Sequence, residues 1–171
     1  ARWVRQAPYL PQCGGPGATP HRPLLERLPT EEQYAAIELF RGSMVRHNVV
    51  ACRKDDRSPA QPIRFDDAAW PEYVPLRAPD TICIQEQLPP GASAVLINRA
   101  HTYTDIYLPL NAQQKMLFDT IDGKRTISDI APQAAQRDAA KVLFEGLWWY
   151  DQIVFDTSLQ PGSGPNGVTH S

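Results

Sequence analysis

Residues 92–157 read ASAVLINRAHTYTDIYLPLNAQQKMLFDTIDGKRTISDIAPQAAQRDAAKVLFEGLWWYDQIVFDT, and this stretch decides the fold of the chain. Two apolar runs, residues 94–97 and 105–108, flank a polar tip at residues 101–104, a pattern that predicts a hairpin with a longer loop. Apolar residues then recur at helical spacing as far as residues 153–155, which look like a short buried strand. The predicted order is two strands, three helices and a closing strand.

Polar residues mark the start of each predicted helix. Asn111 with Gln114, and Thr126 with Asp129, have the i, i+3 spacing of a capping box. Asp138 can cap the third helix. The positions predicted to face the core, or to flank that face, are Met116, Leu117, Ile121, Ile127, Ile130, Ala131, Leu143, Phe144, Leu147, Trp148 and Tyr150.

Two residues should end or interrupt these helices. Gly123 offers a left-handed stop after the first helix. Pro132 falls within the second predicted helix, where proline removes a backbone hydrogen bond, so we expect that helix to be short or kinked.

A hairpin, three helices and a closing strand are the succession of a winged helix-turn-helix, which can bind nucleic acid or protein. A third helix that reads DNA needs polar and basic side chains, with Lys or Arg nearby for the phosphates. Here residues 142–144 and 147–149 are all apolar or aromatic, and the chain has 17 Lys plus Arg against 19 Asp plus Glu. This composition disfavours a winged-helix transcription factor and favours a protein or peptide partner.

Three runs in this stretch resemble a known family. DIYLPLN at residues 105–111, LFDTIDGKRTISDI at residues 117–130 and VLFEGL at residues 142–147 look like PqqD-type domains, the precursor-peptide recognition elements of ribosomal peptide natural-product biosynthesis. The central motif is an aliphatic-Asp-Gly-x-Arg/Lys-Thr-aliphatic turn between two helices. Pro132 departs from the family pattern.

The resemblance implies a binding subunit that is not an enzyme and needs no cofactor or metal. Family members take up an extended peptide as an added strand at their sheet edge, beside the third helix, and hold it for a partner modifying enzyme. Such an edge offers unpaired N–H and C=O groups, and alternate side chains of the guest can enter pockets. The peptide-binding residues implied here are Asp105, Ile106, Tyr107, Leu108, Leu143, Leu147 and Trp148, the two leucines having a core role as the alternative.

Aromatic residues elsewhere are candidate contacts with the partner protein. Neighbouring helical positions point about 100° apart, so one core is not expected to bury both Trp148 and Trp149. An exposed aromatic side chain often anchors an interface, although packing against the first half of the chain is the alternative. The candidate partner-binding residues are Trp149, His101, Tyr103, Trp3 and Tyr9.

Composition divides the chain into four parts, which together predict an α+β protein. Residues 1–30 are rich in Pro and Gly and should form an arm rather than a continuous helix or central strand. Residues 31–91 form the front half, residues 92–157 the winged-helix part, and residues 158–171 a disordered tail with little apolar surface.

The front half is predicted as one helix followed by a small sheet. Thr30 can cap the helix, whose apolar stripe is Tyr34, Ile37, Phe40 and Met44. Strands are expected at residues 49–52, 63–65 and 82–84, with an irregular connector at residues 70–75. The sheet could continue into the hairpin of the second half.

A second resemblance concerns residues 34–53. They look loosely like the regulatory region that follows the catalytic domain of some bacterial protein methyltransferases and precedes a winged-helix tail. The chain would then be the regulatory or substrate-binding part of a SAM-dependent methyltransferase. A glycine-rich cofactor loop after a strand is missing from the sequence, so the catalytic part would lie elsewhere.

Residues suited to catalysis are few and scattered. Neither the histidines nor the cysteines have the spacing of a metal site or of a C-x-x-C pair. Cys13 with His21, or Cys52 with His47, could form a thiol and a base, which leaves a thiol enzyme as a rival hypothesis. Without an apolar run long enough for a bilayer or a signal peptide, we expect a cytoplasmic protein.

Overall fold

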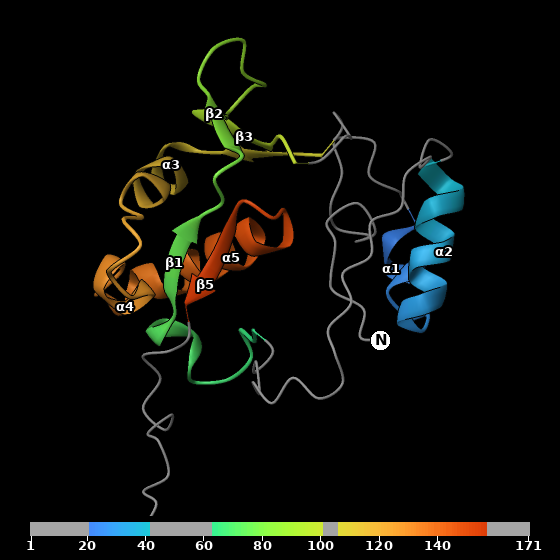
Figure 1. The fold of residues 1–171 in the computed structure, drawn as a ribbon, viewed down its shortest axis with the longest axis horizontal. Coiled ribbons are helices and arrows are strands. Elements are labelled where there is room, and N and C mark those ends of the chain that lie inside the picture. Colours follow the sequence, from blue (N-terminus) through green and yellow to red (C-terminus); the bar gives the residue numbers. More distant parts are fainter. Residues whose placement is uncertain (1–20, 42–62, 101–105, 157–171) are drawn as a thin grey trace, which may run out of the picture.

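The computed structural model describes residues 21–41, 63–100 and 106–156 (Figure 1). These residues form an α+β fold with two small antiparallel sheets, as the sequence predicted. Along the chain the elements are α1 (Arg22–Leu25), α2 (Thr30–Arg41), the 3-10 helix η2 (Trp70–Glu72), β1 (Val74–Arg77), β2 (Thr81–Ile84), β3 (Ala94–Asn98), β4 (Tyr107–Leu110), α3 (Ala112–Asp119), α4 (Ile127–Ile130), α5 (Ala134–Trp149) and β5 (Ile153–Asp156).

The predicted hairpin is the antiparallel pair β3–β4, in which Leu96 lies opposite Leu108. β4 runs from Tyr107 to Leu110, two residues later than the sequence indicated, and the predicted tip lies outside the described residues. β2 adds a third strand on the other side of β3, where Cys83 lies opposite Leu96. The sheet order β2-β3-β4 therefore leaves β4 at one edge of the described sheet.

The two strands of the front half, β1 and β2, both pair with strands of the predicted winged-helix part. β1 pairs with β5 from the far end of the chain, and the two strands lie side by side in Figure 1. This pairing and that of β2 with β3 join residues 74–84 to the predicted winged-helix part in one body. The connector predicted at residues 70–75 is wrong in its second part, because Val74 already begins β1.

The closing strand forms as predicted but is buried on one side only. Ile153 is 1% exposed and Val154 is 58% exposed, which is the alternation of a strand with one face on the core. Its sequence was expected to be buried throughout. Pairing with the short strand β1 leaves the opposite face to solvent.

Both predicted capping boxes are present. The Asn111 carboxamide accepts from Gln114 N–H at 2.9 Å, and the Thr126 hydroxyl accepts from Asp129 N–H at 3.2 Å. The apolar phase of α3 differs from the prediction, since Phe118 is 2% exposed and Met116 is 71% exposed. Three consecutive apolar residues at positions 116–118 left that phase ambiguous in the sequence.

Pro132 shortens the second helix as predicted. α4 ends at Ile130, and the chain turns through Ala131 before Pro132. The predicted cap of the third helix is wrong: α5 begins at Ala134 after an extended Gln133, and Asp138 lies in its second turn. Alanine has the highest helix propensity, which favours a helix that begins at Ala134, two residues after Pro132.

One hydrophobic core lies between the sheets and helices α3, α4 and α5, with Leu96, Phe118, Ile127, Phe144 and Leu147 among its buried members. Residues 63–65 do not form the predicted strand. Instead the buried Phe65 ring lies among aromatic rings, 6.1 Å from Trp70, 6.2 Å from Tyr73, 6.4 Å from Trp148 and 5.7 Å from Phe155, measured between centroids.

α2 begins at Thr30 as predicted, and Ile37 is its buried residue. Phe40 is more than half exposed, so the predicted apolar stripe is only partly buried among the described residues. The Thr30 side chain, Met44 and the strand predicted at residues 49–52 lie outside the description. None of the helices in the described ranges is long and apolar enough to cross a membrane.

Candidate functional site

The predicted site residues fall into three groups. Asp105, His101, Tyr103, Trp3 and Tyr9 lie outside the described residues. Ile106, Leu143 and Leu147 are buried in the core. The partly exposed residues are Tyr107 and Leu108 on β4 and Trp148 and Trp149 at the end of α5.

The leucines of α5 lie beneath the surface, and its two tryptophans are half-buried. Leu143 and Leu147 belong to the hydrophobic core, and Trp148 packs against that core and against Phe65. The alternative role of the two leucines, core packing, is therefore the one seen. Trp149 is half-buried next to Trp148, so neither tryptophan is fully enclosed.

The backbone of β4 has a defined direction. Leu110 C=O accepts from Ser93 N–H at 2.7 Å, so the carbonyl of Leu110 points toward the β3 side of the sheet. In an antiparallel ladder, successive residues direct their backbone groups to opposite sides. Tyr107 and Pro109 therefore direct theirs away from β3. Among bonds between described residues, none reaches these outward groups.

A groove of about 630 Å³ lies beside β4. All four residues of the strand contribute to its wall, together with the turn before β3, the start of α3 and the end of α5. The lining residues are Pro89, Pro90, Gly91, Ala92, Tyr107, Leu108, Pro109, Leu110, Asn111, Gln114 and Tyr150. The groove thus adjoins the predicted peptide-binding strand.

The chemistry of the groove is uncharged, because none of its lining residues carries a formal charge. Asn111 and Gln114 supply the polar side chains. Gln114 Oε1 accepts from Asn111 N–H at 3.0 Å, and Asn111 Oδ1 accepts from Gln114 N–H. The two amide oxygens are thus used by the capping box, while the two amide NH₂ groups donate no hydrogen bond to another described residue.

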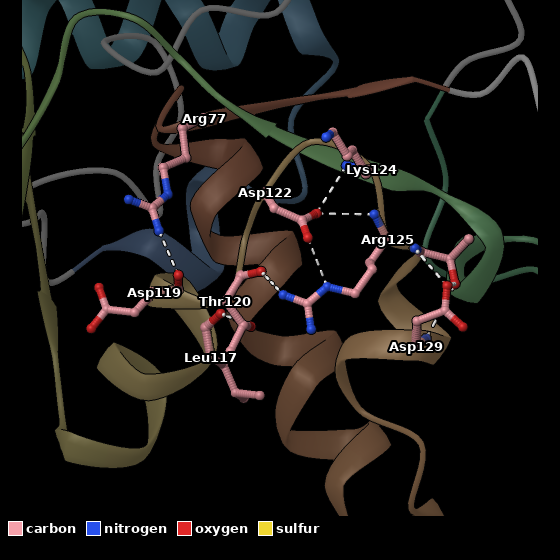
Figure 2. A network of polar contacts seen from close by, with 9 residues as sticks. Arg77, Leu117, Asp119, Thr120, Asp122, Lys124, Arg125 and Asp129 are labelled. Atoms are coloured by element: carbon pink, nitrogen blue, oxygen red, sulfur yellow. Dashed lines mark hydrogen bonds and ion pairs between the residues drawn. The ribbon is translucent and has the colours of Figure 1, made fainter.

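The turn between α3 and α4 carries the Asp-Gly-x-Arg-Thr motif, and its polar groups satisfy one another (Figure 2). The Asp122 carboxylate accepts from Lys124 N–H at 2.9 Å, from Arg125 N–H at 3.0 Å and from Arg125 Nε at 2.8 Å. These bonds, first the backbone N–H of Arg125 and then that of Lys124, hold the Asp122 pKa far below its usual value. The motif therefore stabilises a turn and leaves few hydrogen-bonding groups available to a ligand.

The helix ends on either side of that turn are also hydrogen-bonded to β1 or to the residue just before it. Arg77 Nη2 donates to the carbonyls of Phe118 and Asp119 at 2.8 and 2.9 Å, the second of which is drawn in Figure 2. The guanidinium of Arg77 lies 4.5 Å from the centre of the Phe118 ring. Ile127 N–H donates to Tyr73 C=O at 3.0 Å. The end of α3 and the start of α4, which flank the turn, are thus bonded to residues 73–77 at and before β1.

Groups suited to metal binding or acid–base chemistry do not gather at the groove. No cluster of three or more His, Cys, Asp or Glu side chains able to hold a metal ion occurs within the described ranges. Burial raises the pKa of Glu145, with Lys141 opposing that shift and Asp66 adding to it, but Glu145 does not line the groove.

A scan against protein-family models found no matching family, and a search of curated proteins found no match. The assignment of the β4 edge and its groove as a candidate site therefore depends on the geometry of the structure. Sequence reasoning missed Pro89, Pro90, Gln114 and Tyr150, which the tertiary fold brings to β4 from three separate segments. Pro109 carried a readable signal, because proline within a strand marks an edge.

Proposed function

We propose that this chain is a non-catalytic binding protein that takes up an extended peptide segment along β4 and presents it to a partner modifying enzyme, as in ribosomal peptide natural-product biosynthesis. The observation that carries the proposal is the outward side of β4, where Tyr107 offers N–H and C=O and Pro109 offers C=O. Both residues also line the groove. The order of hairpin, three helices and closing strand, which we interpret as a winged helix, agrees with the PqqD-type resemblance.

Backbone pairing would supply part of the affinity. Each hydrogen bond between a guest strand and β4 would contribute on the order of 0.5–1.5 kcal/mol net. Side chains of the guest that point toward the groove would add apolar contacts with Tyr107, Leu108 and Tyr150. This combination binds many sequences weakly and a matching sequence more tightly, as suits a carrier of one substrate peptide.

The residues of α5 have a supporting part in this proposal. Leu143 and Leu147 are core residues that hold α5 against the sheet. Substituting them would unfold the body rather than change an accessible contact. Tyr107 and Leu108 remain the proposed contact residues from the predicted set, because they line the groove.

A displayed library of random peptides, selected on the full chain, supplies the probe. The tightest peptide is synthesised, and each of its amides is methylated in turn. Strand addition predicts that methylation weakens binding at every second residue, where the guest amide faces β4, and is tolerated at the residues between. Hydrogen exchange should show protection of the Tyr107 amide on peptide addition.

Two outcomes contradict the proposal. One is the absence of any selected peptide that binds the folded chain. The other is a peptide whose affinity shows no alternating response to amide methylation and leaves the exchange of Tyr107 unchanged. Val154 on β5, in the other sheet, provides the matched control, since its amide should gain no protection beyond that of the rest of the core.

A further inference from the structure

Pro109 interrupts the outward side of β4. It lies opposite Val95 and directs its backbone away from β3, as argued from the Ser93–Leu110 bond. Proline has no backbone N–H, and it is tolerated in sheets where that missing donor would have faced away from the partner strand. The outward side of β4 thus offers a donor and an acceptor at Tyr107 but only an acceptor at Pro109.

We infer that Pro109 sets the limit of strand addition and fixes the register of the guest, an inference that rests on the proposed function. A guest strand can make a reciprocal pair of hydrogen bonds with Tyr107 and donate one bond to Pro109 C=O. Its own carbonyl opposite Pro109 finds no donor on β4. The guest leaves the edge at this position and continues along the groove, to whose wall Pro109 contributes together with the rest of β4.

The lining of the groove determines which side chains of the guest can bind where the guest leaves β4. Its walls are three prolines, two tyrosines and aliphatic residues, without a formal charge. An aromatic or aliphatic guest side chain is buried there at low cost, whereas a charged one would lose its hydration without gaining a partner. The NH₂ groups of Asn111 and Gln114 can donate to the guest carbonyls that no longer pair with β4. The occupant is an extended peptide with an uncharged, aromatic or aliphatic residue at its exit point.

Pro109→Ala tests the register limit, since alanine restores the missing N–H. Against the synthetic peptide selected on the wild-type chain, we expect about 2- to 10-fold tighter binding, as one added hydrogen bond gives. Hydrogen exchange should show the new amide at position 109 protected by the peptide. Pro75→Ala is the matched control, because Pro75 lies within β1, is buried, and does not line the groove.

The results separate the inference from the proposed function. If Pro109→Ala binds as the wild type does and its new amide stays unprotected, while methylation of the guest amide opposite Tyr107 still weakens binding, the register limit is wrong and strand addition stands. If no methylated position matters in either chain, strand addition itself fails.

A charge exchange tests the groove. Replacing the guest residue at the exit point by Lys should weaken binding to the wild type by about tenfold or more. Gln114→Glu keeps the capping-box acceptor and places a carboxylate in the groove, so it should recover about 3-fold of that loss. Equal binding of the parent and Lys peptides to the wild type would overturn the assignment of an uncharged guest.

Discussion

Both sheets of this protein carry a proline in an edge strand, and the two prolines lie in opposite surroundings. Pro75 of β1 is fully buried, and the neighbouring turn between α3 and α4 is bonded to the same strand through Arg77. Pro109 of β4 is exposed beside an uncharged groove. Proline ends backbone pairing on one flank in both strands. At β1 that flank is covered by the α3–α4 segment of the protein itself, whereas at β4 no bond from another described residue reaches it.

The largest expected effect on stability tests whether the β1–β5 sheet covers a hydrophobic core. Ile153→Ala should lower the free energy of unfolding by about 2–5 kcal/mol, because Ile153 is buried beneath the β1–β5 sheet. Val154→Ala, one residue along the same strand but exposed, should change it by about 0.5 kcal/mol or less. Urea denaturation followed by tryptophan fluorescence measures both. Similar losses would contradict the one-sided burial of β5.

Arg77 tests how firmly the turn closes β1. Arg77→Ala removes two hydrogen bonds to carbonyl groups and the contact with the Phe118 ring, and should lower the free energy of unfolding by about 1–3 kcal/mol. Arg77→Lys keeps the charge without the planar fork and should lose an intermediate amount. Peptide affinity should stay unchanged in both variants. A change in affinity larger than the change in stability would mean that the two strands are not independent.

Replacing two glycines by alanine should change the free energy of unfolding in opposite directions. Gly123 has φ +73°, and a Cβ there would lie at ordinary contact distance, 3.7 Å, from Leu76 of β1. Gly123→Ala should therefore lower the free energy of unfolding by about 1–2 kcal/mol through backbone strain alone. Gly146→Ala, inside α5 with open space around its Cβ, should raise it by about 0.5–1 kcal/mol. Thermal unfolding of the two variants measures both changes. If both variants were stabilised or both destabilised, the left-handed conformation assigned to Gly123 would be contradicted.

The smallest effect concerns pH. The folded state holds the Asp122 pKa far below that of an unfolded Asp, about 3.9, through the N–H groups of Arg125 and Lys124. Stability from this carboxylate is therefore complete above about pH 4 to 5 and declines as the pH falls below that value. Asp122→Asn should lower the stability at neutral pH and flatten its acid dependence. A variant whose denaturation midpoint falls with acid as steeply as that of the wild type would show that other groups govern this range.

The sequence predicted elements that depend on local signals. The capping boxes at Asn111 and Thr126 and the early end of α4 at Pro132 follow from a few neighbouring residues, and all are present. β1 could not be predicted in this way. It is four residues long, contains Pro75, and pairs with β5 from the far end of the described body, so only the tertiary fold stabilises it.

The candidate site shows the same division. The PqqD-type resemblance implied Tyr107 and Leu108 as contact residues on the edge strand, and both line the groove. Gln114 and Tyr150 reach it from helices whose ends lie far apart in sequence. Leu143 and Leu147 share their spacing with any core-facing helix, so sequence alone could not distinguish burial from contact.

The pairing of β1 with β5 has a consequence for attachment. The described residues from 63 to 156 form the main body of the protein. Phe65 lies near the beginning of this body and Phe155 near its end, and their ring centroids are 5.7 Å apart. A polypeptide fused ahead of this body and another fused behind it would therefore emerge from adjacent points. The body can be inserted into a loop of a larger protein without a long spacer, and a circular permutant that links these ends should keep its core.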